Sequence, residues 1–149
     1  MGSAILAGML ASDFDATKIS VSTKSAASAN KLSHDHGVRA IALEISAEAN
    51  REAVEDADVI LIATKPAYVV EVLRDVSSNI KAGALVISVA AGITTAAMEA
   101  AGRAASPERA LAWVGLEANR TLLNHALSVR CWPKGEQHLL AAAHAHGAW

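Results

Sequence analysis

Four consecutive polar residues, Ser22, Thr23, Lys24 and Ser25, have the side-chain chemistry of an anion site. Their hydroxyl groups can donate hydrogen bonds and the lysine supplies a positive charge, which together suit a phosphate group. They lie at the end of a short run, KISVS, that is predicted to be a strand. A second interpretation is equally open, in which the segment is a solvated turn and Ser25 caps the next helix.

Two further segments place small residues where a ligand could lie close to the backbone. They are Ala63, Thr64, Lys65 and Pro66, and the pair Ala91 and Gly92. Lys65 could pair with a phosphate or orient a substrate, and Gly92 allows a positive φ or a close approach. The alternatives are a surface lysine before a helix and an ordinary turn between a strand and a helix.

The first eleven residues are predicted to form a helix with one apolar side. At its start, the backbone N–H groups of Gly2 and Ser3 could donate hydrogen bonds to a phosphate. The alternative is an amphipathic helix that binds no ligand.

Strands and helices are predicted to alternate at short spacing. The predicted strands are residues 18–22, 38–42, 58–64, 84–90 and 109–114. The predicted helices are residues 1–11, 25–36 and 46–57, one that Pro66 opens, one from Thr94 or Thr95 to Ala101, and 137–146. Gly37 and Gly102 are expected to end the helices before them. Because residues 58–64 and 84–90 show no polar alternation, they are predicted to be adjacent central strands, buried on both faces.

This order predicts an α/β fold with a doubly wound, mostly parallel sheet. Such sheets bind ligands outside the carboxyl ends of their strands. The candidate residues stand at those ends, after the predicted strands.

Composition narrows the class of protein. The chain has 149 residues, 52% of them hydrophobic and 19% charged, which suits one domain with a sizeable core. A net charge of −2 without a basic stripe argues against nucleic-acid binding. The single cysteine, Cys131, excludes an internal disulfide framework and favours the reducing cytoplasm. No signal peptide and no run as long as a membrane span is recognised, so no membrane partner is predicted.

Metal binding has little support in the sequence. His34 and His36 form one His-x-His pair and His144 and His146 form another. No cysteine or carboxylate completes either pair at a recognisable spacing, so no metal site is predicted. Cys131 has no convincing histidine partner and is interpreted as structural.

Four motifs resemble those of the pyrroline-5-carboxylate reductase family, in the same order and at the same spacing. MGSAILAGML is similar to the stretch that follows the family's glycine-rich turn, roughly GxGNMxxAIxxGL, and VSTKS is similar to VSxRS. DVILIATKP and LVISVAAGIT resemble DVVILAVKP and LVISIAAGIT. The resemblance covers residues 1–102 and implies a Rossmann-like dinucleotide-binding domain.

The resemblance implies a role for each candidate segment. Gly2 and Ser3 would receive the pyrophosphate, the ATKP segment would line the cleft near ribose and nicotinamide, and the AAG turn would lie beside the nicotinamide ring. The ribose-recognition position falls at residues 21–25, where no Asp or Glu is present to select NAD. The hydroxyl groups and Lys24 therefore favour NADP.

The resemblance also implies parts that this chain lacks. They are the first strand with its glycine turn, and a C-terminal helical domain that forms the dimer and completes the substrate site in the family. Residues 103–149 would be the divergent end of the same nucleotide-binding domain. Within them, only Asn119 agrees with the family's MPNTP motif, and it is carried over as the catalytic residue. Without a first strand, the sheet is expected to have an unpaired apolar edge.

Members of this family reduce 1-pyrroline-5-carboxylate to L-proline with NAD(P)H, the last step of proline synthesis. The resemblance implies an oxidoreductase with this small-molecule substrate, homo-oligomeric as in the family. One alternative is a non-catalytic, truncated NADP-binding fragment. Another is a different NADP-dependent dehydrogenase, such as a coenzyme F420-dependent NADP reductase, over which the AAGIT segment favours the proline enzyme. The isolated chain is expected to have little or no reductase activity.

Overall fold

The computed structural model describes residues 2–12, 14–105, 112–115 and 139–142. Its strands are β1 (Ile19–Thr23), β2 (Arg39–Ala42), β3 (Val59–Ile62), β4 (Leu85–Ser88), β5 (Ala112–Gly115) and β6 (Leu139–Ala142). Its helices are α1 (Gly2–Leu10), α2 (Ala26–His36), α3 (Ala49–Val54), α4 (Pro66–Val76) and α5 (Thr95–Ala105), with a 3-10 turn at Ala16–Lys18. No helix among these described residues is long and apolar enough to cross a membrane.

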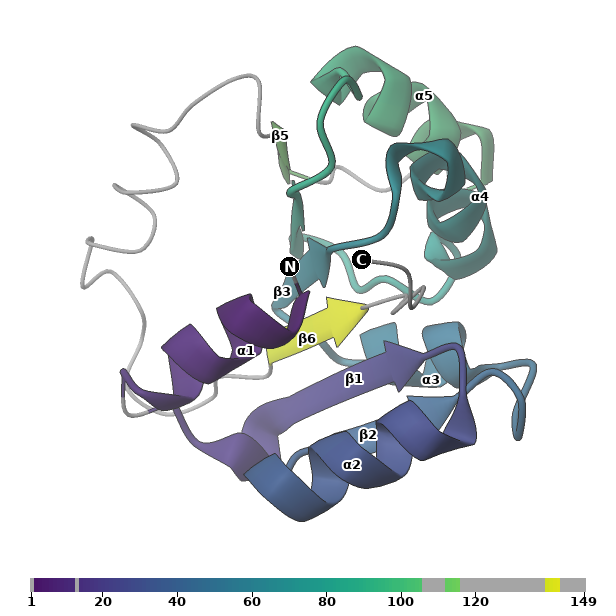
Figure 1. Cartoon of the computed structure of the whole chain (residues 1–149). Helices are drawn as coiled ribbons and strands as arrows, with labels where there is room; N and C mark the ends of the chain where they lie inside the picture. The colour runs from purple at the N-terminus through teal and green to yellow at the C-terminus, as the bar shows by residue number, and fades with distance from the viewer. Residues whose placement is uncertain (1, 13, 106–111, 116–138, 143–149) are drawn as a thin grey trace.

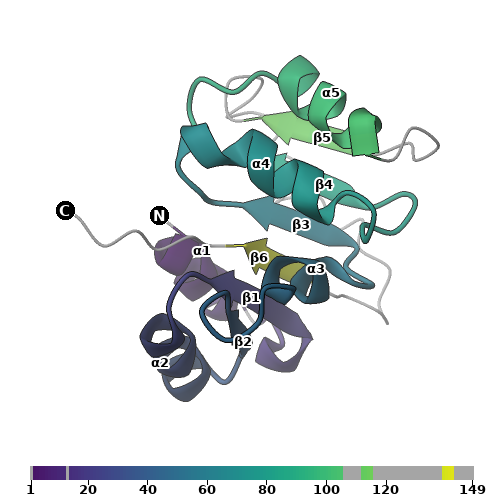
Figure 2. The ribbon, with the colours of Figure 1, turned by 90° about the vertical axis from the view of Figure 1, so that its right-hand side faces the viewer.

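The described strands form one sheet in the order β2-β1-β6-β3-β4-β5, and every neighbouring pair is parallel (Figure 1). Helices α1 and α2 pack on one face of the sheet, while α3, α4 and α5 pack on the other (Figure 2). The predicted doubly wound α/β fold is therefore confirmed. The carboxyl ends of all six strands share one edge, which is where such sheets bind ligands.

Strands β3 and β4 are adjacent, as their apolar runs predicted. They pair in parallel from Val59 opposite Leu85 to Ile62 opposite Ser88. All four β3 residues are buried, because the strand has helices on one face and an apolar cluster that includes Ile5 of α1 on the other. This register brings the loops after β3 and β4 to the same edge of the sheet.

Strand β6 corrects two expectations. Residues 137–146 were expected to be helical, but Leu139–Ala142 form a strand that pairs with both β1 and β3. A short apolar run has no periodicity that separates helix from strand, and here two open strand edges supply the hydrogen-bonding partners. The predicted unpaired edge is therefore wrong, since β6 occupies the place that the first strand takes in the 3-2-1-4-5-6 order of this fold class.

Three local predictions also need correction. The helix expected at 46–57 is shorter, Ala49–Val54, because Ile45 and Ser46 donate backbone hydrogen bonds to Ala42 and so form a turn. The expected helix end at Gly102 is wrong, since α5 runs on to Ala105. Flanking alanines favour the helix enough to carry it through one glycine, which costs about 1 kcal/mol. The strand expected at 109–114 is β5, Ala112–Gly115, and residues 109–111 lie outside the described residues.

The largest core cluster lies between the sheet and helices α3, α4 and α5. It joins Ile60, Ile62 and Val86 of the sheet to Val69, Leu73 and Val76 of α4. These three residues belong to the stripe that the sequence predicted, and the fourth residue of that stripe, Val72, is also buried. Pro66 stands at the first turn of α4, where the missing N–H costs nothing. This packing fixes α4 against the sheet and so positions the residues at its start.

We expect Leu73→Ala to destabilise the domain by about 2–5 kcal/mol, because it removes a fully buried side chain from a close-packed cluster. Urea unfolding followed by circular dichroism measures the change. Arg74→Ala, on the exposed side of the same helix, is the control. A loss at Leu73 no larger than at Arg74 would contradict this packing.

Candidate functional site

The turn after β1 begins helix α2, and its hydroxyl groups serve that purpose. Ser25 is the N-cap of α2, and its side chain accepts a hydrogen bond from the backbone N–H of Ser28 at 3.3 Å. Thr23 is buried, and its hydroxyl donates to the carbonyl oxygen of Ser25 at 3.0 Å. The capping interpretation of Ser25 is therefore confirmed, and Lys24 is the exposed residue of the turn.

The turn after β2 lies directly beside the turn after β1. Backbone hydrogen bonds continue past the ends of the two strands, from Leu43 to the carbonyl oxygen of Thr23 at 2.8 Å and from Glu44 to that of Lys24 at 3.1 Å. The carboxylate of Glu44 then reaches α2, where it accepts a hydrogen bond from the N–H of Ala26 at 2.9 Å. An acidic side chain thus stands at the start of α2, next to Lys24.

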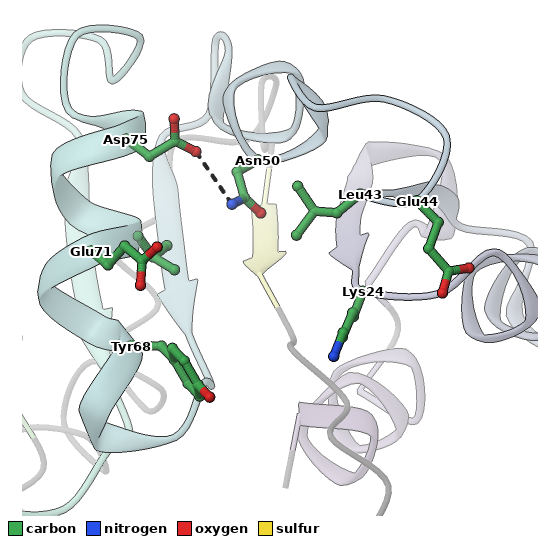
Figure 3. A pocket seen from close by; sticks show the side chains of 8 residues that line it. Lys24, Leu43, Glu44, Asn50, Tyr68, Glu71 and Asp75 are labelled. Atoms are coloured by element: carbon green, nitrogen blue, oxygen red, sulfur yellow. Dashed lines mark hydrogen bonds between the residues drawn. The ribbon is translucent and has the colours of Figure 1, made fainter.

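A cleft of about 640 Å³ opens at this edge, between the two turns and helices α3 and α4 (Figure 3). Tyr68, Glu71 and Asp75 lie on the α4 wall, Lys24, Leu43 and Glu44 lie on the opposite wall, and Asn50 lies between them. Val72 completes the lining. The cleft therefore combines an aromatic ring and aliphatic groups with one cation, the amide of Asn50 and three carboxyl groups, those of Glu44, Glu71 and Asp75.

Asn50 presents an unsatisfied acceptor in this cleft. The residue is 5% exposed, and its Nδ2 donates to Asp75 at 3.3 Å. Because a carboxylate only accepts, the amide nitrogen must face Asp75, which leaves the carbonyl oxygen as the free atom. That Oδ1 is buried and has no hydrogen-bonding partner within the described structure. A buried acceptor without a donor is costly, so a ligand hydroxyl or amine is favoured there.

An ion-pair network holds Asn50 in place. Arg51 donates from Nε to Asp75 Oδ1 at 2.9 Å and from Nη1 to Glu48 at 2.7 Å, which ties α3 to α4. The hydrogen bond to Glu48, followed by the charges of Asp75 and Glu48, raises the pKa of Arg51 above its usual value. The guanidinium is therefore charged at every physiological pH, and Asp75 is held where it orients the Asn50 amide.

The sequence alone does not single out Asn50 or Glu44. Asn50 was interpreted as part of a longer helix, and nothing in its neighbours indicates that one amide oxygen is buried without a donor. Glu44 lies 18 residues from the N–H that it meets. Only the pairing of β1 with β2 brings the two together.

The second group of candidates follows β3 and β4, on the other side of β6. Thr64 is buried and donates from its hydroxyl to the carbonyl oxygen of Lys65 at 3.3 Å, while Lys65 is exposed and is the N-cap of α4. Ala91 and Gly92 form an exposed turn, in which Gly92 has a φ of 74° that disfavours other residues. Ala63, half-buried, and the exposed Pro66 flank this site, apart from the Lys24 cleft.

The other residues that the sequence analysis considered lie in different parts of the chain. Gly2 is buried and Ser3 is exposed at the start of α1, which lies near the carboxyl end of β6 (Figures 1 and 2). Ser22 is buried, with a hydroxyl that has no partner among the described residues, and it does not line the cleft. Asn119, Cys131 and the second histidine pair lie outside the described residues. Within the described residues, no group of three metal-ligating side chains is found.

The curated proteins similar to this chain are pyrroline-5-carboxylate reductases, as the four motifs indicated. The Corynebacterium melassecola enzyme is 31% identical over 110 residues, which are 72% of this chain and 38% of that enzyme. The Escherichia coli enzyme is 36% identical over 95 residues, or 63% and 33%. The Pseudomonas aeruginosa enzyme is 30% identical over 100 residues, or 67% and 34%. The matched region therefore spans only about a third of these relatives.

Two family models divide the chain. Residues 85–149 match a family described as an uncharacterized protein conserved in bacteria, and this stretch includes Asn119. Residues 1–92, which carry both groups of candidate residues, match the family described as NADP oxidoreductase, coenzyme F420-dependent. The match over residues 1–92 covers more than half of the chain, and it agrees with the doubly wound sheet and with the reductase relatives. The chain belongs to the coenzyme F420-dependent NADP oxidoreductase family and carries its nicotinamide dinucleotide-binding domain.

Proposed function

We propose that the chain binds NADPH along the carboxyl edge of its sheet, with the adenosine end in the cleft beside Lys24. The observation that carries this proposal is Asn50, whose buried Oδ1 lacks a donor in a cleft that also holds a cation. A ribose hydroxyl group would supply the missing donor, and Lys24 would pair with the 2′-phosphate. None of the ion pairs found among the described residues involves Lys24, so its charge is available to a ligand.

The rest of the cofactor would extend from this cleft toward the loops after β3 and β4. The N–H groups at the start of α1, at Gly2 and Ser3, would hold the pyrophosphate. The turns at Thr64 and Gly92 would lie beside the nicotinamide, because small residues there leave the backbone accessible. When bound, the reduced nicotinamide supplies the hydride, and the protein's part is to position it.

We propose 1-pyrroline-5-carboxylate as the substrate and L-proline as the product, on the strength of the relatives' names and the AAGIT segment. In this proposal residues 1–102 bind the dinucleotide, residues 103–149 end the same domain, and Asn119 contacts the substrate. A C-terminal helical domain, as in the family, would form the dimer and enclose the substrate.

A second candidate function is the reduction of NADP by reduced coenzyme F420, which the description of the matching family favours. The two candidates differ in the partner of the nicotinamide. Pyrroline-5-carboxylate supports oxidation of NADPH in the first case, whereas reduced coenzyme F420 supports reduction of NADP in the second. Both assays use absorbance of the same nicotinamide, so one preparation distinguishes them.

We expect Lys24→Ala to weaken NADPH binding and to leave NADH nearly unchanged. Losing one charge-assisted contact to the 2′-phosphate should cost about 1.5–3 kcal/mol, or roughly tenfold to hundredfold in Kd. Calorimetric titration with both cofactors measures it. Lys31→Ala, which removes an exposed lysine of α2 that does not line the cleft, is the matched control. Equal affinity of the unmodified chain for both cofactors would refute the preference.

A further inference from the structure

The start of α2 already holds an anion that belongs to the chain. Ala26 is the first residue of the helix, and its N–H is bound at 2.9 Å by the carboxylate of Glu44. The N–H of Ser28, two residues on, is capped by Ser25. Two of the first three N–H groups of α2, those of Ala26 and Ser28, are therefore occupied by a carboxylate and a hydroxyl. A phosphate bound beside Lys24 would need the same donors.

We propose that Glu44 is a specificity-determining residue of the adenosine end, and that it limits the preference for NADPH over NADH. This inference rests on the proposed cofactor site. A 2′-phosphate that pairs with Lys24 meets the Glu44 carboxylate as a like charge and must displace it from the N–H of Ala26. The ribose of NADH carries a 2′-hydroxyl at that position, which can donate to the same carboxylate.

The backbone holds Glu44 in this position. Its N–H donates to the carbonyl oxygen of Lys24, and the preceding Leu43 donates to that of Thr23. The two turns are thus hydrogen-bonded to each other, and a rotation of the Glu44 side chain is enough to move its carboxylate away from Ala26. Both Lys24 and Glu44 are exposed, so salt should weaken the repulsion between carboxylate and phosphate together with the attraction of the lysine.

A second, independent observation points to a ligand in the same cleft. Asn50, which lies between the two walls, has a buried carbonyl oxygen without a donor. The hydrogen bond from its Nδ2 to Asp75 orients the amide, and in this orientation Oδ1 has no donor. The cleft therefore has an acceptor suited to a ribose hydroxyl group, and Glu44 lines the same cleft. In the proposed cofactor site, the 2′-substituent that differs between NADPH and NADH would lie on its wall.

The test is Glu44→Gln, with NADPH and NADH titrated calorimetrically against the full chain at low salt. The glutamine keeps an oxygen that accepts from Ala26 and removes the charge. We expect NADPH to bind about three- to tenfold more tightly and NADH to change by less than about twofold, with the NADPH gain shrinking as salt is raised. Glu55→Gln removes an exposed acid at the end of α3, which does not line the cleft, and should change neither affinity.

A second variant covers the case in which the glutamine alters the turn. Glu44→Ala frees the N–H of Ala26 and should also raise the ratio of NADPH to NADH affinity, with the thermal unfolding midpoint recorded for each protein. Binding of both cofactors with an unchanged or lower ratio in both variants would overturn the role of Glu44 alone. Failure of the unmodified chain and all variants to bind either cofactor would overturn the proposed cofactor site itself.

Discussion

Proline in place of Leu140 is expected to unfold the domain. Leu140 is in β6, with Ser20 of β1 on one side and Ile60 of β3 on the other. Proline lacks the N–H that a central strand must donate, and its ring does not fit between two paired neighbours. We expect a loss of about 3 kcal/mol or more, which is a large part of the stability of an ordinary domain.

Urea unfolding followed by circular dichroism measures this loss, and hydrogen exchange shows where protection disappears. Leu140→Val is the control, because it keeps the N–H and has a high strand propensity, so it should change stability little. If Leu140→Pro unfolded at nearly the same urea concentration as the unmodified chain, β6 would not be a central strand in solution. We also expect the amide protons of β1 and β3 to lose protection together, because both strands pair with β6.

The parts of the fold that local signals specify could be predicted from the sequence. The runs DVILIAT and ALVISVA carry strand character without reference to the rest of the chain, and the structure pairs them as expected. Gly37 ends α2 with a φ of 70°, and Pro66 begins α4. In each case the residue type restricts the backbone directly.

The parts that tertiary partners decide could not be predicted in this way. Residues 139–142 carry the same apolar character as a buried helical turn, and only the open edges of β1 and β3 make them a strand. No acid directly follows β1 in the sequence, yet Glu44 reaches that place from the turn after the neighbouring strand β2. The capping role of Ser25 was one of two interpretations left open, because a helix start and a phosphate site use the same donors.

We expect the 149-residue chain to oxidise NADPH with pyrroline-5-carboxylate at least about a thousandfold more slowly than the same chain joined to the remaining C-terminal part of the Escherichia coli relative. Effective molarities of about 10⁵–10⁸ M arise only when both reactants are held in line. The matched region is 33% of that relative, and the family resemblance assigns enclosure of the substrate to a C-terminal helical domain.

The experiment separates binding from chemistry, because NADPH affinity is measured on both proteins before turnover. Similar affinity with a large difference in kcat would place the deficit in the substrate half of the site, whereas weak NADPH binding by the short chain alone would place it in the cofactor half. Asn119 can also be tested in the joined protein, where Asn119→Ala should lower kcat if that residue contacts the substrate. If the 149-residue chain alone turned over at about 1–10³ s⁻¹, the range typical of enzymes, the assignment of substrate enclosure to a further domain would be wrong.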